Sequence, residues 1–327
     1  GGARDRAETV VLAPRGWAGP VPAGARVVES PTKLVWLLGR TLVDGPDDLQ
    51  AATGLMSQYA LTPLAARMTG ARIPELVVNI SPPGNTTHMP GGLLFFDALG
   101  EALALDPPPE RDRCALEAFA KAGIGPGMTP SRAGDPVASA ALAAAFDAGR
   151  KLVDRAVRHY RKEGRRRYGG WSFSGPTTGR FGTGYAYRAI VARAAFGANV
   201  REEALYPQTD ADDRGRKLTG RHKYVLEFPP GKLPPVRAFW SVTLYDAEHF
   251  LVENPIERYA IGDRTPGLRY GKRGGLKIRI SAEPPESGTE NWLPAPRGRF
   301  ELLLRLYEPK PAAYKGRWVP PAVRRVR

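Results

Sequence analysis

The chain has 327 residues, enough for about two domains, and its 42% apolar and 25% charged residues are typical of a globular protein. Its 37 Gly and 32 Pro exclude a collagen-like or disordered chain and predict many turns, which favours short strands over a helical bundle. A net charge of +15 attracts anions and acidic surfaces, and the single cysteine, Cys114, excludes an intrachain disulfide and a CxxC zinc or redox site.

The first segment, residues 1–69, is predicted to be a β remnant followed by a helix. Short strands are expected at 10–12, 26–28 and 34–38, separated by Gly and Pro turns. A helix is expected after Gly45-Pro46-Asp47-Asp48, because apolar residues then recur every three or four positions. The apolar run 34–38 is far shorter than the roughly 20 residues of a membrane span, so we expect a soluble protein with no membrane span.

The middle segment, residues 70–200, is predicted to be mainly helical. Its clearest helix begins with Asp135 as the N-cap and Pro136 at the first helical position, and it runs to about Lys162 along an apolar stripe. A shorter helix is expected from residue 183 or 184 to Phe196, after a Gly-rich loop whose spacing fits no nucleotide-binding motif.

The last segment, residues 201–327, changes from a helical period to a period of two. Alternating apolar residues predict strands at 224–228, 239–245, 276–280 and 300–307. Strands joined by long returns and Pro-rich turns are typical of an antiparallel β-sandwich or jelly roll. The expected fold class is therefore α+β and β-rich, with an N-terminal β remnant, a helical middle and a C-terminal sandwich.

Four ordered blocks of the last segment resemble one known family. The blocks are 234–246, 254–264, 291–296 and 304–307, and they resemble the bacterial domain-of-unknown-function family 1214. Pro31 to Trp36, with Gly39-Arg40 leading into Asp44-Gly45-Pro46, is similar to the end of its usual partner, family 1254. Most of that partner domain is missing, so we expect a processed product or a fragment. The resemblance implies a two-part β-rich protein with a helical middle, and it implies no reaction.

The best catalytic candidates follow the predicted strand 239–245. Asp246 and His249, in the sequence Tyr245-Asp246-Ala247-Glu248-His249, would act as general acid or base at a strand end, where sites are often found. The alternative interpretation is that Asp246 accepts backbone N–H groups in a turn and that His249 is simply solvated.

Five residues are candidates for ligand binding. Arg305 lies on the strand face opposite Leu302 and would anchor an anion if that face lined a cavity. Arg258 would bind an acidic group of the ligand through two hydrogen bonds. The alternative is that the Asp263 carboxylate pairs with Arg258 or Arg264 and fixes the conformation of the loop. Trp292 would stack on a ligand or plug the end of the sandwich. Tyr245 and Arg188 complete the predicted pocket, although an arginine on such a helix more often exposes its head.

Metal and nucleic-acid sites have weaker support. The four histidines are dispersed and none pairs with another at two to four residues' spacing, so we expect no His-based metal site, with carboxylates from distant segments left as the alternative ligands. We also expect no organic cofactor. The basic residues between Arg150 and Arg167 are the best nucleic-acid candidate, but a solvated helix face is the favoured interpretation. The last four residues, 324–327, are predicted to be a tail.

The favoured function is an enzyme that acts on a small anionic or hydroxylated organic molecule in a polar pocket between the sandwich and the middle helices. One alternative is a non-catalytic sandwich that binds carbohydrate or assembles with its own copies, and the other is nucleic-acid binding through the basic helix face. The expected partner is a small-molecule ligand, with homo-oligomers also considered. The sequence leaves the compartment open, and an extracytoplasmic one is favoured if an upstream signal peptide has been removed.

Overall fold

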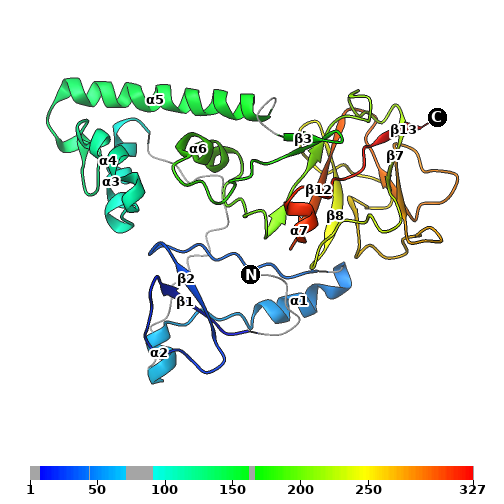
Figure 1. The fold of residues 1–327 in the computed structure, drawn as a ribbon, viewed down its shortest axis with the longest axis horizontal. Helices are drawn as coiled ribbons and strands as arrows, with labels where there is room; N and C mark the ends of the chain where they lie inside the picture. The colour runs from blue at the N-terminus through cyan, green and yellow to red at the C-terminus, as the bar shows by residue number, and fades with distance from the viewer. Residues whose placement is uncertain (1–7, 44, 71–90, 162–165, 327) are drawn as a thin grey trace. The chain divides into compact units, whose positions relative to one another are not determined.

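The structure is a computed structural model that describes residues 8–43, 45–70, 91–161 and 166–326 (Figure 1). Contacts divide the chain into two compact units, residues 4–148 and 149–327. The boundary falls inside the helix α5 (Pro136–His159). The finer division at residues 69/70 and 200/201 stays a prediction. None of the described helices is long and apolar enough to cross a membrane.

The first unit contains one small sheet and several helices. Its strands β1 (Val10–Pro14) and β2 (Arg26–Ser30) pair in parallel. The helices and 3₁₀ turns that follow are η1 (Pro46–Asp48), α1 (Leu49–Met56), α2 (Leu64–Thr69), α3 (Leu93–Leu105), η2 (Glu110–Asp112), α4 (Arg113–Ala120) and η3 (Pro130–Arg132). The predicted N-terminal strands at 10–12 and 26–28 are confirmed.

The predicted strand at 34–38 is wrong. This segment forms no strand, and the side chains of Leu34 and Trp36 are 67% and 64% exposed. The backbone N–H of Leu34 instead donates to the Asp106 carboxylate, 3.3 Å away. An apolar run forms a strand only where a neighbouring strand pairs with its backbone N–H and C=O groups. No described strand pairs with residues 34–38.

The helix α5 begins where the sequence predicts. The Asp135 carboxylate accepts the backbone N–H groups of Val137 and Ala138 at 2.9 and 3.1 Å, and Pro136 is the first helical residue. The N-cap therefore satisfies two of the N–H groups that the first turn leaves without a helical partner. The predicted shorter helix is α6 (Tyr185–Ala194).

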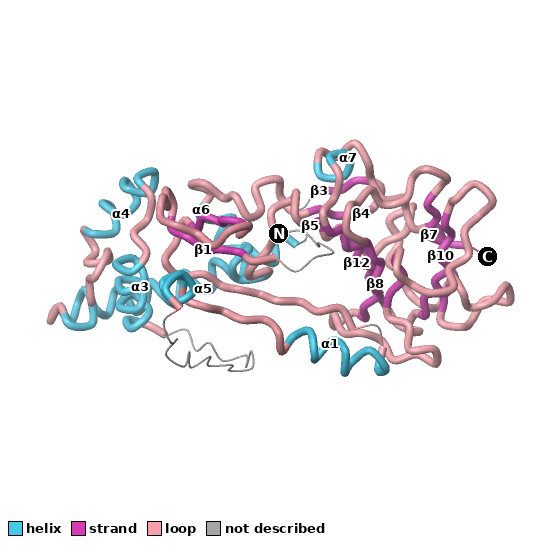
Figure 2. Tube along the Cα trace, turned by 90° about the horizontal axis from the view of Figure 1, so that it is seen from below, coloured by secondary structure: helices cyan, strands magenta, loops and turns pink. Residues whose placement is uncertain are grey.

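The second unit is built on two sheets. The smaller has the order β11-β10-β7-β13, and the larger has the order β3-β4-β6-β12-β8-β9, with β5 also pairing with β12. Their bounds are β3 (Arg166–Tyr168), β4 (Trp171–Phe173), β5 (Ala204–Leu205), β6 (Gln208–Thr209), β7 (Lys223–Phe228), β8 (Trp240–Asp246), β9 (Ala260–Gly262), β10 (Leu276–Ser281), β11 (Trp292–Pro294), β12 (Phe300–Tyr307) and β13 (Arg324–Val326). A short helix, α7 (Pro311–Tyr314), follows β12. Figure 2 shows β12 and β8 in one layer and β7 and β10 in another.

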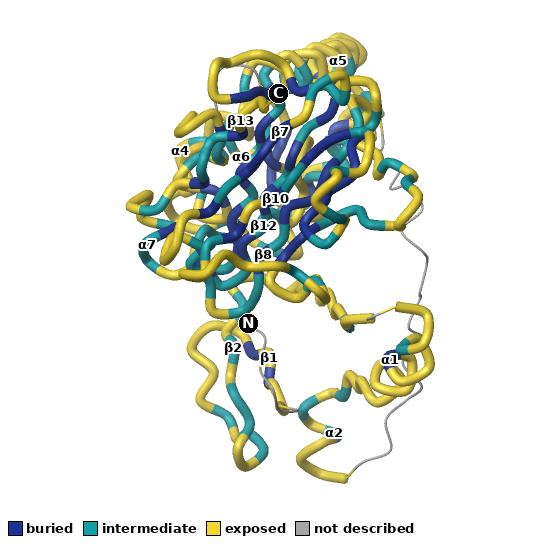
Figure 3. Tube along the Cα trace, turned by 90° about the vertical axis from the view of Figure 1, so that its right-hand side faces the viewer, coloured by how far each residue is buried: buried dark blue, intermediate teal, exposed yellow. Residues whose placement is uncertain are grey.

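The core of this unit lies between the two sheets. Phe300, Leu302, Leu304 and Leu306 alternate along β12 as buried residues and share one cluster with Ile278 of β10 and other inward residues of β7 and β8. Figure 3 shows the same strands as the buried part of the unit. Because every second side chain of a strand faces the same way, the outward residues are left for the surface. The α+β, β-rich fold class is confirmed, and the jelly-roll connection stays a prediction.

Two pairings were not expected. The predicted tail is wrong, because β13 pairs antiparallel with β7, and Arg324 forms an ion pair with Glu227 at 2.7 Å. The strand β11 pairs with β10 in parallel, whereas the other pairs of this unit's sheets are antiparallel. A parallel neighbour needs a crossover, and residues 282–291 supply it.

Candidate functional site

The outer face of the larger sheet brings Arg305 and Tyr245 together. The guanidinium of Arg305 donates to the Thr243 hydroxyl at 2.5 Å and to the Tyr245 hydroxyl at 2.6 Å. All three side chains lie on the face of β12 and β8 that points away from the core. Both partners of Arg305 are neutral, and no described carboxylate forms an ion pair with it. Within the described residues, the Arg305 charge therefore has no carboxylate partner.

His249 and Asp246 have different partners in the turn after β8. The Asp246 carboxylate accepts the N–H groups of Glu248 and Phe250 at 3.0 and 2.8 Å, so it holds the turn. His249 adopts a φ of 68° and places its Nδ1 2.8 Å from the Glu301 carboxylate. In the register of the sheet Glu301 lies opposite Tyr245, and both are on the same face as Arg305. The His249–Glu301 pair is therefore on that face. Asp246 lies opposite the buried Phe300 and so is on the other face.

Arg258 and Trp292 serve the framework of the smaller sheet. The Arg258 guanidinium donates to the backbone oxygens of Thr289, Glu290 and Trp292 at 2.5, 3.1 and 3.1 Å. The Trp292 side chain is only 1% exposed, and its indole N–H donates to the Ser281 oxygen at 3.0 Å. A ring so buried is not presented to a ligand from solvent.

Two further side chains of the prediction lie elsewhere. Arg188 is an exposed residue of α6 whose guanidinium lies over the Tyr185 ring, 5.2 Å from its centroid. Asp263 accepts the backbone N–H of Trp240 at 3.1 Å, and Arg264 lies over the Phe239 ring at 4.4 Å. Within the described ranges no three His, Cys, Asp or Glu residues gather as metal ligands would.

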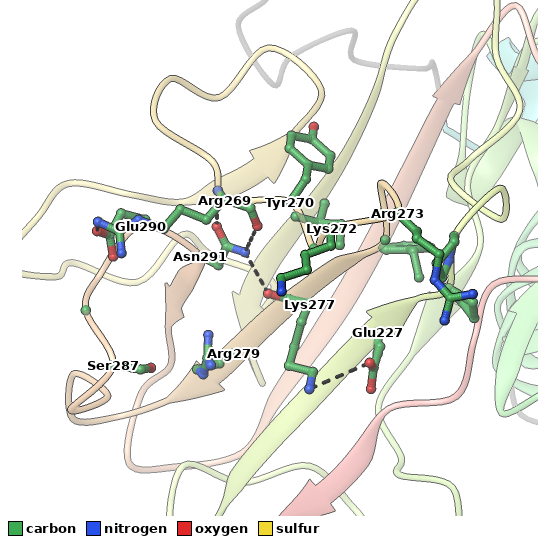
Figure 4. A pocket seen from close by; sticks show the side chains of 17 residues that line it. Glu227, Arg269, Tyr270, Lys272, Arg273, Lys277, Arg279, Ser287, Glu290 and Asn291 are labelled. Atoms are coloured by element: carbon green, nitrogen blue, oxygen red, sulfur yellow. Dashed lines mark hydrogen bonds and ion pairs between the residues drawn. The ribbon is translucent and has the colours of Figure 1, made fainter.

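A pocket of about 540 Å³ lies on the outer face of the smaller sheet (Figure 4). It is walled by the end of β7, the loop 269–275, the strand β10 and the segment 287–291. Lys277 and Arg279 reach it because they alternate with the buried residues of β10. None of the residues predicted from the sequence as ligand-binding lines this pocket, although the two cations in the turn 271–275 are a signal for it.

The pocket has an excess of positive charge. Five cations and two carboxylates line it: Arg269, Lys272, Arg273, Lys277 and Arg279 against Glu227 and Glu290. Arg269 pairs with Glu290, and Lys277 lies 3.6 Å from Glu227. The remaining three cations, Lys272, Arg273 and Arg279, have no ion pair with any carboxylate in the part of the chain that the structure describes. Such a surface favours an anion.

Asn291 holds one wall of the pocket in place. Its buried side chain accepts the Arg269 N–H at 2.8 Å and donates to the Arg269 and Lys277 oxygens at 2.7 and 3.0 Å, as Figure 4 shows. These three bonds tie the loop that carries Lys272 to the strand that carries Arg279. The described lining of the pocket contains cations, carboxylates and the amide of Asn291, and no imidazole.

The fold and these sites define an α+β protein whose second unit is a two-sheet sandwich with polar outer faces. Two family models match the chain, "Protein of unknown function (DUF1214)" over residues 203–311 and "Protein of unknown function (DUF1254)" over residues 1–63. The chain therefore carries a region similar to each of these two families, and the resemblance is confirmed.

A solved structure with a TM-score of 0.69 supports the fold. The crystal structure of the VPA0106 protein from Vibrio parahaemolyticus is 24% identical, with a TM-score of 0.69, and the match covers 97% of this chain and 75% of that one. A putative uncharacterized protein from Burkholderia cenocepacia is 17% identical, with a TM-score of 0.29 over 66% of this chain and 49% of that one. No curated protein matches the chain.

Proposed function

We propose that the protein binds a small anionic organic molecule in the pocket formed by the loop 269–275, β10 and the segment 287–291. The observation that carries this proposal is the set of three cations, Lys272, Arg273 and Arg279, around one cavity and without a carboxylate partner among the described residues. Arginine presents a planar fork that binds carboxylate or phosphate with two hydrogen bonds, and lysine adds a point charge.

The size and chemistry of the pocket narrow the ligand class. A volume of about 540 Å³ suits a molecule of metabolite size. Glu227, Glu290 and Ser287 provide polar atoms for hydroxyl groups of the same ligand. The expected ligand therefore carries two or more carboxylate or phosphate groups and some hydroxyls.

The test measures binding of citrate, inorganic phosphate and the neutral polyol sorbitol by calorimetry. Citrate is expected to bind in a salt-dependent manner, and each of Lys272→Ala and Arg279→Ala should weaken it about tenfold, as expected for losing a hydrogen bond to a charged group. The matched control is Arg317→Ala, which removes an exposed cation outside this pocket. Equal binding of citrate to the wild type and to the Lys272→Ala/Arg279→Ala double variant, or equal binding of sorbitol and citrate, contradicts the proposal.

An enzymatic function at the outer face of the larger sheet is the second candidate. It is favoured by the His249–Glu301 contact of 2.8 Å, which lies on the same face as Arg305, a cation that forms no ion pair with a described carboxylate. An ionised Glu301 accepts the Nδ1 proton of a neutral His249, which leaves the Nε2 lone pair available as a general base. Arg305 and the Tyr245 hydroxyl would then position an anionic substrate.

This second function is tested by following a mixture of small organic acids and their esters by NMR. Turnover by the wild type should be lost in His249→Gln, whereas Arg305→Lys should raise KM more than it lowers kcat. His159→Gln changes a histidine of α5 and is the control. Turnover that survives both His249→Gln and Arg305→Ala, or an inactive wild type, argues against catalysis at this face.

A further inference from the structure

One carboxylate of the anion pocket is shared with a cation that lies outside the pocket. Glu227 of β7 lines the pocket, whereas Arg324 of β13 is not among its lining residues. The strand β13 flanks β7 on the side away from β10, and Arg324 lies opposite Val225, two residues before Glu227. Side chains on such a diagonal share one face of the sheet, and a long side chain spans the distance between them. Arg324 therefore reaches Glu227 from the edge of the sheet opposite to the pocket.

The two cations beside Glu227 bind its carboxylate unequally. The Arg324 guanidinium donates a charge-assisted hydrogen bond to Glu227 Oε2 at 2.7 Å. The Lys277 ammonium lies 3.6 Å from Oε1, which is beyond hydrogen-bond distance (Figure 4). Lys277 is directly opposite Glu227 in the pairing of β10 with β7, so the strands themselves do not keep these two groups apart. The carboxylate is held toward β13, and the N–H donors of Lys277 are left for another acceptor.

We propose that Arg324 is a positioning residue of the anion pocket, which holds the Glu227 carboxylate and so leaves Lys277 as a fourth cation for the ligand. This role rests on the proposed function and deepens it, because it makes anion binding depend on β13. Without Arg324, the Glu227 carboxylate would pair with Lys277 alone, and its negative charge on the pocket wall would repel an anionic ligand.

The expected effect on affinity is modest, because the ion pair is partly exposed. The side chains of Arg324 and Glu227 are 56% and 39% exposed. Ion pairs of this exposure contribute little in water, so loss of the Arg324 cation should weaken anion binding about threefold. The effect should decrease with added salt, which screens exposed charges.

The test measures citrate binding to the full chain by calorimetry. Arg324→Met keeps an aliphatic side chain without the cation and should weaken citrate binding about threefold. Arg324→Lys restores a cation and should recover most of the affinity. The matched control is Arg325→Met, which removes the next cation of β13. Arg325 lies opposite the core residue Tyr224 and is therefore on the other face of the sheet, so its variant should bind citrate as the wild type does.

A double-mutant cycle separates positioning from a general loss of positive charge. Glu227→Gln should tighten citrate binding, because it removes the carboxylate that competes for Lys277. In the Glu227→Gln background Arg324→Met should have no further effect, because the group that it positions is gone. Lys277→Ala should weaken citrate binding about as much as Lys272→Ala does, since both would remove a cation that contacts the ligand.

Three results would overturn this role of Arg324. They are equal citrate affinities of Arg324→Met and Arg325→Met, an undiminished effect of Arg324→Met in the Glu227→Gln background, and wild-type affinity in Lys277→Ala. The last result counts even if Arg324→Met does not fold. If the wild type does not bind citrate, or binds it equally in the Lys272→Ala/Arg279→Ala variant, the proposed function itself fails and the role of Arg324 fails with it.

Discussion

Replacing Asp212 should destabilise the second unit more than any exposed acid does. The Asp212 side chain is 1% exposed, and its carboxylate accepts the backbone N–H groups of Arg214 and Arg216, each at 2.9 Å, and the Arg216 guanidinium at 2.7 Å. Each hydrogen bond to a charged group contributes about 1.5–3 kcal/mol, and the half-exposed guanidinium contributes less. Asp212→Ala should therefore lower the free energy of unfolding by about 3 kcal/mol.

The assay is urea denaturation at pH 7 followed by tryptophan fluorescence, because Trp171, Trp240 and Trp292 are buried in this unit. Asp212→Asn keeps an oxygen acceptor for the turn and should cost about 1 kcal/mol. Asp213→Ala removes the exposed neighbouring acid and should stay within about 0.5 kcal/mol of the wild type. An Asp212→Ala variant as stable as Asp213→Ala would refute the reasoning.

The same carboxylate predicts a dependence on pH. Burial alone would raise the pKa of Asp212, but the hydrogen bonds from the Arg216 side chain and from the N–H groups of Arg216 and Arg214 outweigh it and hold the pKa below its usual 3.8. A lowered folded-state pKa means that the stabilisation is complete above the unfolded pKa and is lost as the pH falls through the folded one. The stability difference between the wild type and Asp212→Asn should be constant near neutral pH and shrink below pH 3.8. A difference that grows on acidification contradicts this sign.

Three other substitutions test a buried side chain, a close approach of two segments and the N-cap of α5. Trp292→Ala should lower the free energy of unfolding by about 4 kcal/mol in the same urea assay, because it leaves a cavity at a buried site. The control is Phe250→Ala, which removes a 70% exposed residue and should cost little. Equal costs of the two substitutions would disprove the burial argument. Gly220→Ala would place a Cβ 1.8 Å from the Pro296 oxygen and should cost about 1–3 kcal/mol of unfolding free energy. The control is Gly298→Ala, whose added Cβ meets nothing within 4 Å. A Gly220→Ala protein with the wild-type Tm would show that the segments around Gly220 and Pro296 can separate. Asp135→Ala should cost about 1 kcal/mol, measured by ellipticity during unfolding, with Asp135→Asn near wild type; if both were equally costly, capping would not be the cause.

The long elements were predictable because their sequences repeat a local pattern. In β8, β10 and β12 every second residue is apolar, β7 contains a run of consecutive apolar residues, and α5 begins at Pro136 directly after the N-cap Asp135. The strands β3 and β13 have three residues each, too few to show a period, and partners far along the chain define them. The apolar run 34–38 looked like a strand because hydrophobicity alone does not show whether a partner strand is present.

The candidate sites were predictable only in part, for the same reason. Strand alternation placed Arg305 on the outer face, and the position of Tyr245 beside it depends on the register between β12 and β8. The pocket cations come from a turn and from alternate positions of β10, and Asn291 joins them through contacts 14 and 22 residues apart in sequence.

The strand β10 carries the core on one side and the pocket on the other. Leu276, Ile278 and Ile280 point inward, and Lys277 and Arg279 point outward. Inserting one residue at the start of this strand would shift its register by one, which would turn Lys277 and Arg279 into the interior and push Leu276, Ile278 and Ile280 into water. Insertions and deletions among relatives should therefore avoid β10 and accumulate in the turn 271–275. A change of length there alters the positions of Lys272 and Arg273 and leaves the register of β10 unchanged.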